Sequence, residues 1–192
     1  MDIKDELHRK LRAARASFLS RLDGLDEYGL RRPMTPTGTN LLGLAKHLGT
    51  MEYGYLGDCV GRPAPEPIPW LEDGSIWDGG DMWATPRESS QQIVAFYRRA
   101  CEHADASVDV LDLDSPAHVP WWAEGERDTT LGVLLVRMLD ETAHHAGHAD
   151  IVRELVDGLA GPDHDEIDDA TWREYLERVQ AAADAFRPSA SG

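Results

Sequence analysis

The chain of 192 residues contains little cysteine and far fewer basic than acidic side chains. Its two cysteines, Cys59 and Cys101, are far apart, so they can build neither a disulfide framework nor a multi-cysteine zinc motif. Lysine and arginine number 19 against 35 acidic residues, and the formal net charge is −16. Because phosphate binding needs a basic face, this balance argues against nucleic acid and against an anionic membrane surface as partners.

Signals for export, membrane insertion and several catalytic motifs are also missing. Residues 1–6 are charged and contain no apolar signal core, and no apolar run approaches the length that spans a bilayer. There is no His-Glu-x-x-His motif and no phosphate-binding glycine loop, and one Glu-x-x-His is too few for a di-iron bundle. We therefore expect a cytoplasmic protein with a single domain over residues 1–188 and a disordered tail over 189–192.

The sequence does contain a series of amphipathic segments with helical periodicity. Stop and start signals place these helices at residues 2–25, from Thr39 or Asn40 to about 61, from a capping box at 85–88 to about 111, from Thr129 or Thr130 to Gly158, and around 172–186. Two long loops, 63–84 and 112–128, separate them, and Trp70, Trp77 and Trp83 are expected to pack the first loop over one end of the bundle. With no convincing strands, the pattern predicts an all-α fold: a four-helix bundle with an additional C-terminal helix and two long loops.

The helix expected over residues 131–155 carries the most informative pattern. At alternating spacings of three and four residues it places Leu131, Leu134, Met138, Glu141, His145, His148, Val152 and Leu155. A bundle helix should have apolar residues at positions 141, 145 and 148, but this one has a carboxylate and two imidazoles. Burying such groups is costly unless they are paired, hydrogen-bonded or bound to a metal. The pattern therefore predicts a site, and most economically a metal site.

A second helix must contribute, because one helix does not normally close a coordination sphere. His47 lies at the edge of the apolar stripe in the helix that begins near residue 40, and Glu52 follows one turn later as a candidate partner of a ligand or general base. His144 lies about 60° from the seam and is interpreted as flanking, although His144 and His148 form an i, i+4 pair that can bind a metal. Zinc, nickel and iron(II) all accept such ligands, and a buried polar network without metal is the alternative.

Three segments then resemble a known family. Residues 131–158, LGVLLVRMLDETAHHAGHADIVRELVDG, are similar to the signature helix of the DinB-like superfamily, in particular of its DUF664 branch. The run LLGLAKHLGTMEYGYL, residues 41–56, looks like the helix of that family that bears a metal histidine, and Val119-Pro120-Trp121-Trp122 also looks typical of it. The similarity extends over most of residues 5–186 in the order of the elements.

This resemblance implies a four-helix bundle with a divalent metal site at one end, similar to the metal-binding domain of mycothiol-dependent maleylpyruvate isomerase and to bacterial thiol S-transferases. By position, His47 is the ligand from the second helix, and Glu141 with His145 matches the ligand pair of the late helix. His148 either completes the site or orients it, so the third ligand is Glu141 or His148. Trp121 and Trp122 are candidates to line a pocket.

The expected function is that of a metal-dependent thiol S-transferase or isomerase. Its substrates would be a small-molecule thiol, mycothiol, and an electrophile, with Glu52 as a candidate base. Zinc is the favoured metal, with nickel or iron as alternatives, and a homodimer is considered. The alternative is a non-enzymatic, stress-associated bundle protein that binds metal. A third hypothesis is a bundle without metal.

Overall fold

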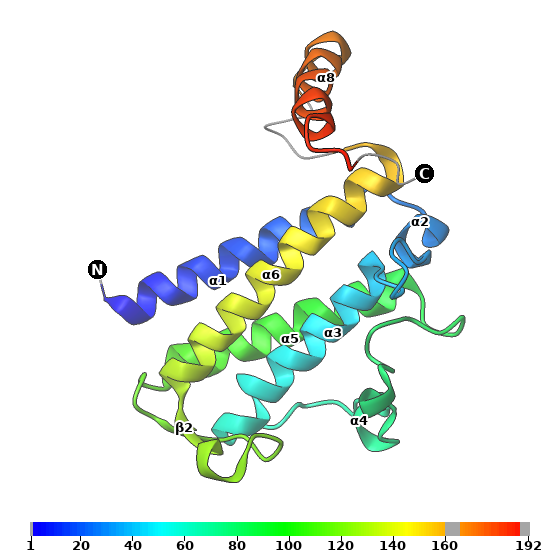
Figure 1. Ribbon diagram of the computed structural model, residues 1–192. Helices are drawn as coiled ribbons and strands as arrows, with labels where there is room; N and C mark the ends of the chain where they lie inside the picture. Colours follow the sequence, from blue (N-terminus) through cyan, green and yellow to red (C-terminus); the bar gives the residue numbers. More distant parts are fainter. Residues whose placement is uncertain (1, 160–165, 189–192) are drawn as a thin grey trace.

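The structure, a computed structural model, describes residues 2–159 and 166–188, and four long helices dominate it (Figure 1). They are α1 (Ile3–Ser20), α3 (Leu41–Tyr55), α5 (Ser90–Val110) and α6 (Leu131–Asp157). The most extensive contacts join α3 to α5 and α1 to α6, and α3 also packs against α6. The predicted all-α bundle is therefore confirmed, whereas the tail expected over 189–192 lies outside the described residues.

Shorter elements fill the connections between these helices. They are α2 (Glu27–Arg31), η1 (Asp58–Val60), α4 (Pro69–Glu72), η2 (Ser75–Asp78), β1 (Pro116–His118), η3 (Glu124–Glu126) and β2 (Asp128–Thr130). The C-terminal helix α8 (Asp169–Asp184) follows α6. The two strands pair in antiparallel fashion, with Ala117 opposite Thr129. The prediction that the chain has no strands is wrong here, because three-residue strands are too short to display an alternating pattern.

Two helix boundaries differ from the expected ones. The first helix ends at Ser20 instead of residue 25, because the chain turns through Gly24, whose φ of +78° glycine adopts without strain. The third long helix begins at Ser90, with a capping box formed by Ser89 and Gln92. The capping box predicted at 85–88 does not start the helix.

The core lies between the four helices and is built mainly from leucine. Its fully buried side chains include Leu11, Phe18, Leu44, Leu48, Tyr97, Leu131, Leu134 and Met138. Further along α6 the buried stripe passes to Thr142, Ala146, Ala149 and Val152, so Leu155 is exposed, contrary to the predicted seam. A straight helix repeats every 3.6 residues, so a 3.5-residue seam drifts by about 20° per heptad. This drift places Glu141 and His145 at the edge of the buried stripe.

The loop between α3 and α5 is anchored by one of its three tryptophans. Trp70 is buried, donates its indole N–H to Thr50 Oγ1 at 2.8 Å, and lies under the Lys46 ammonium, 4.2 Å from the ring centroid. Trp77 and Trp83 are 76% and 52% exposed, so the prediction that they pack onto the bundle is wrong. A tryptophan count alone does not show which indole finds a partner for its N–H group.

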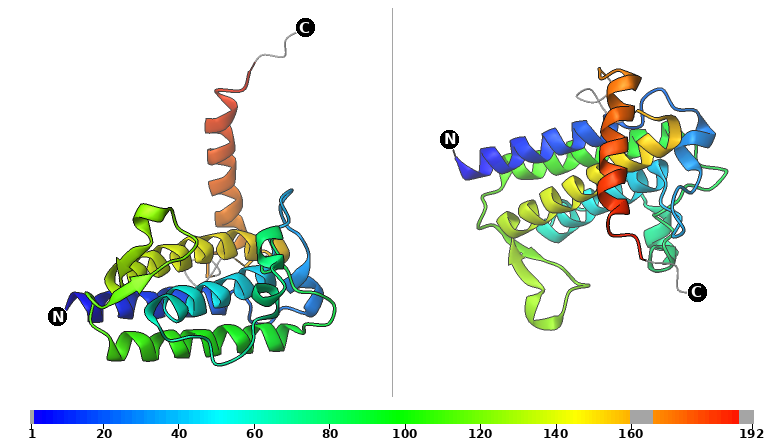
Figure 2. Two further views of the ribbon diagram at one scale, coloured as in Figure 1. Left: turned by 90° about the horizontal axis from the view of Figure 1, so that it is seen from below. Right: turned by 45° about the horizontal axis from the view of Figure 1, so that its top comes forward.

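The C-terminal helix α8 stands away from the four long helices (Figure 2). None of its residues is buried, and Leu176, Val179 and Phe186 are exposed. The predicted additional helix is therefore present but does not join the core. No helix among the described residues is long and apolar enough to cross a membrane.

Candidate metal centre

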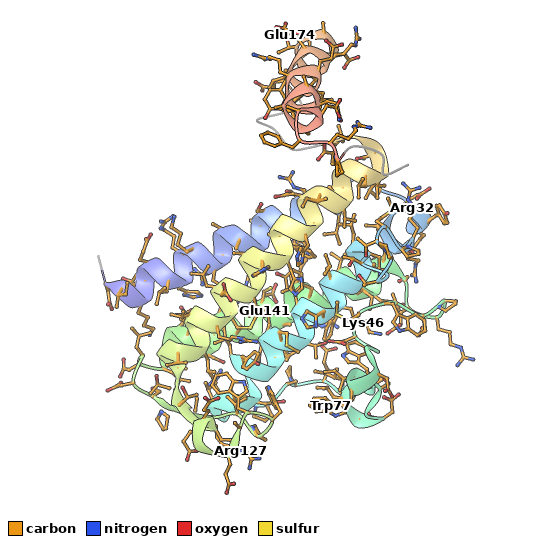
Figure 3. The ribbon with its side chains drawn as sticks, in the orientation of Figure 1. Arg32, Lys46, Trp77, Arg127, Glu141 and Glu174 are labelled. Carbon is orange, nitrogen blue, oxygen red and sulfur yellow. The ribbon has the colours of Figure 1, made fainter. Side chains whose placement is uncertain are left out.

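Three side chains converge where α3 and α6 face each other. His47 Nε2 and His145 Nε2 each lie 3.1 Å from the same oxygen, Glu141 Oε1. One ligand atom from each of the three residues lies within 4.8 Å of the others, and all three side chains are partly buried. Figure 3 shows Glu141 between the α6 and α3 ribbons. The structure thus brings together three of the four predicted metal ligands.

Helix geometry explains this convergence. Glu141 and His145 are four residues apart on α6 and therefore share a face, and His47 meets them from the middle of α3. The triad lies midway along both helices. The family resemblance had implied a site at one end of the bundle, so the position differs from that expectation. The triad is reached from the side because the edge position of Glu141 and His145 leaves them partly exposed.

A buried carboxylate that the sequence did not reveal forms a hydrogen bond with the ring nitrogen of His47 that does not face Glu141. Asp81, only 4% exposed, accepts a hydrogen bond from His47 Nδ1 at 2.7 Å. An ionised carboxylate can only accept, so Nδ1 carries the proton and Nε2 is the nitrogen directed at Glu141. Asp81 follows Gly79 and Gly80 in a loop without periodicity, so no sequence signal connected it to His47.

The electrostatics of the triad favour a positive charge at its centre. Burial disfavours protonation of His47, but hydrogen bonds to Asp81 and Glu141 raise its pKa to about 9. Hydrogen bonds from His145 and then His47 hold the pKa of Glu141 well below its usual range. A guanidinium nitrogen of Arg137 lies 3.8 Å from the other oxygen of Glu141.

This donor set fits a divalent cation. Two imidazoles and one carboxylate are ligands that zinc, nickel and iron(II) accept. The contact between His47 and Asp81 is the arrangement that commonly lies behind a metal-bound histidine. His47, Glu141 and His145 would therefore hold the ion.

The remaining histidines of α6 lie outside this triad. His148 is exposed, and its Nδ1 lies 3.3 Å from Nδ1 of His145, the ring nitrogen that does not face Glu141. Partial burial and the neighbouring His145 and His144 rings lower the pKa of His148. His144 is exposed, and its ring lies tilted against the His148 ring, with centroids 5.5 Å apart. This position agrees with its interpretation as a flanking residue.

Glu52, the candidate base, lies elsewhere in the bundle. It is fully buried, and its two oxygens accept hydrogen bonds from Arg15 Nε and Nη2, both at 2.6 Å. Arg15 also donates to Asp105 on α5 at 2.6 Å. The structure does not bring Glu52 into the triad, and a role as general base stays a prediction.

The two predicted pocket tryptophans lie on the loop between β1 and η3. Both indole N–H groups point at the Tyr55 hydroxyl, Trp121 at 3.3 Å and Trp122 at 3.4 Å. Trp121 lines a pocket that His47 also borders, whereas Trp122 packs against the core cluster beneath.

A model of one protein family matches most of the chain. The model, described as mycothiol-S-transferase, matches residues 6–158. The chain belongs to this family. The family is part of the DinB/YfiT-like superfamily, so the resemblance at superfamily level is confirmed. The match ends at the C-terminal end of α6, and α8 lies outside it.

Comparison with solved structures supports the fold. A crystal structure of a conserved protein from Enterococcus faecalis superimposes with a TM-score of 0.63, covering 83% of this chain and 99% of that one. The two sequences are 14% identical, so the similarity concerns the fold alone. No curated protein matches the chain.

Proposed function

We propose that this protein transfers the sulfur of mycothiol to an electrophile beside a divalent metal held by His47, Glu141 and His145. One observation carries the proposal: two imidazoles from different helices are directed at a single carboxylate oxygen, in a chain of the mycothiol-S-transferase family. Membership of this family indicates mycothiol as the thiol substrate, and the three side chains provide ligands for the metal.

The protein side chains orient this site and set its charge. A divalent cation held there would favour the thiolate form of a thiol, which is the nucleophile at neutral pH. Asp81 fixes the ring of His47 through Nδ1 and leaves Nε2 for the ion. Glu141 is the proposed third ligand, since its oxygen is already shared by both imidazoles. His148 is proposed to orient His145 through the other ring nitrogen.

Zinc is the proposed metal. Catalytic zinc sites commonly use three protein ligands of the imidazole and carboxylate type and keep a further position for water or substrate. Nickel and iron(II) accept the same ligands, so metal analysis of the purified protein decides between them.

The test combines metal content with transfer activity. Wild-type protein should bind about one divalent ion per chain and accelerate the reaction of mycothiol with monochlorobimane over metal-stripped protein. The His47→Ala and His145→Ala variants should lose both properties. His144→Ala is the matched control, because it removes an exposed imidazole from the same helix, and it should keep both. Full metal content in the first two variants would contradict the ligand assignment.

The non-enzymatic alternative has a distinct result in this experiment. A protein that binds the metal through His47 and His145, yet reacts no faster than its metal-stripped form, would be a metal-binding bundle protein. The family name favours the enzyme.

The family branch, the cellular location and the oligomeric state of the protein are proposed on separate grounds. We place the chain in the DUF664 branch on the sequence of its α6 helix, and in the cytoplasm because Cys59 and Cys101 are both free thiols. We also propose a homodimer, supported by the exposed apolar side chains of α8, such as Leu176 and Phe186. Light scattering after size exclusion should give about twice the mass of one chain, and a monomer would contradict the dimer.

A further inference from the structure

A pocket of about 370 Å³ opens next to His47, and most of the surface that lines it is apolar. Its walls include Met51 and Tyr55 from α3, Leu71 and Trp77 from the loop around α4, and Trp121 from the loop after β1. Figure 3 places Trp77 beside the α4 segment. Three separate segments thus build one largely apolar pocket that borders His47 and Asp81.

The polar side chains that border the pocket, which are His47, Thr50, Tyr55, Asp58 and Asp81, each have at least one hydrogen-bond partner. Asp81 accepts from His47, and Asp58 accepts from the backbone N–H of Ala64. Thr50 donates to the Lys46 carbonyl and accepts from the indole of Trp70. A molecule that enters here therefore finds contact surface but few free hydrogen-bonding groups.

This distribution of polarity distinguishes the two substrates of a thiol transfer. Mycothiol carries sugar and inositol hydroxyls, and burying such groups without new hydrogen bonds is unfavourable. An uncharged, apolar or aromatic molecule loses little by leaving water and gains contact with the indole and thioether side chains. The volume is at the lower end of small-molecule pockets, which matches a compact ring system.

We propose that this pocket binds the electrophile, and that the electrophile is an uncharged, compact, apolar or aromatic compound. This inference rests on the proposed function for the reaction, but the binding site itself does not depend on the metal. The thiol then approaches from the exposed side of the triad, where Arg137 and His148 offer polar groups. With a haloalkyl electrophile, the sulfur–carbon bond forms as the carbon–halogen bond breaks, the halide leaves with the electron pair, and the thiol proton passes to water.

Gly54 allows the pocket to be filled without disturbing the triad. It faces Trp121 from α3, and a Cβ placed on it would lie 3.6 Å from the nearest indole atom, an ordinary contact distance. Gly54→Leu should therefore add a side chain toward the pocket. Gly125→Leu is the matched control, because a Cβ on Gly125 meets nothing within 4 Å.

The first measurement is the binding of an unreactive bimane that lacks the chlorine. Tryptophan fluorescence detects this binding in the holoprotein and in chelator-treated protein. We expect saturable binding in both, about tenfold weaker or more in Gly54→Leu and unchanged in Gly125→Leu. Equal binding by the two variants, or no saturable binding, would overturn the proposal even if the thiol transfer is observed.

The second measurement compares two electrophiles in the transfer reaction. For monochlorobimane, Gly54→Leu should raise KM about tenfold or more, while the rate with small, polar iodoacetamide stays within about twofold. An equal loss with both electrophiles would overturn the assignment of the pocket. If no transfer occurs with either electrophile although the unreactive bimane binds as expected, the proposed function fails and the apolar binding site stands.

Discussion

The buried pair of Arg15 and Glu52 offers a decisive test of whether Glu52 stabilises the bundle or acts as a base. The carboxylate is 0% exposed and the guanidinium residue 4% exposed, with two hydrogen bonds of 2.6 Å between them. Burial disfavours the charged guanidinium, but the charge and hydrogen bonds of Glu52 raise the pKa of Arg15 above its ordinary value. Glu52→Gln would leave this cation buried with Asp105 as its remaining carboxylate partner.

Breaking a buried ion pair costs about 3–5 kcal/mol, and we expect about 3 kcal/mol here because Asp105 still faces Arg15. With a typical urea dependence, the unfolding midpoint should fall by about 1–2 M, as followed by circular dichroism at pH 7. The double variant Arg15→Met, Glu52→Leu should recover most of this loss, because apolar side chains leave no unpaired charge. Exposed Glu102→Gln serves as the control and should change the stability by less than about 0.5 kcal/mol.

The same variant separates stability from catalysis. Folded Glu52→Gln protein with full metal content should keep its transfer rate. Loss of a general base typically costs about 10²- to 10⁴-fold in rate. An unchanged urea midpoint together with such a loss of rate would refute our reasoning and establish Glu52 as the base.

Three further predictions concern other contacts. Asp81→Asn should lower the metal affinity about 10- to 100-fold, because the amide lacks the negative charge that the carboxylate places beside His47. Chelator competition measures this affinity, and an unchanged value would contradict the prediction. Hydrogen bonds from Ser90 lower the pKa of Glu27 to about 2, so its stabilisation is present above pH 4.5 and is lost as the pH falls toward 2. Urea titrations should show a stability difference between wild type and Glu27→Gln of about 1 kcal/mol or less, because this group is half-exposed. The difference should shrink from pH 6 to pH 3, and a constant difference would be contrary evidence. At a protein concentration low enough for both chains to be monomeric, a chain ending at Gly158 should melt within about 3 °C of the full protein, since α8 has no buried residue. A drop beyond about 10 °C would show that α8 stabilises the bundle.

The sequence pattern predicted the histidines that converge on Glu141 better than it predicted their surroundings. His47 and His145 interrupt apolar stripes on two helices, and helical periodicity alone places each toward the core. The predicted buried seam of α6 extended too far along the helix. It assumed a repeat of 3.5 residues and so included His148 and Leu155. In the structure both are exposed.

The long loops were the least predictable part of the protein. They contain no periodic pattern, so the sequence did not connect Asp81 to His47 or show that Trp77 and Trp121 line one pocket. Glu52 had the spacing of a site residue, one turn beyond His47, but five residues along a helix turn its side chain toward Arg15 and away from the triad.

The amino-acid sequence by itself determined the helical bundle and the presence of a polar site on its late helix, because helix formation and burial depend on local periodicity. Only the tertiary structure decided that Glu141 joins the two imidazoles, that Asp81 supports His47, and that an apolar pocket lies beside them. These relations involve atoms that are close in space but separated by up to 94 residues along the chain, and no local pattern encodes such distances.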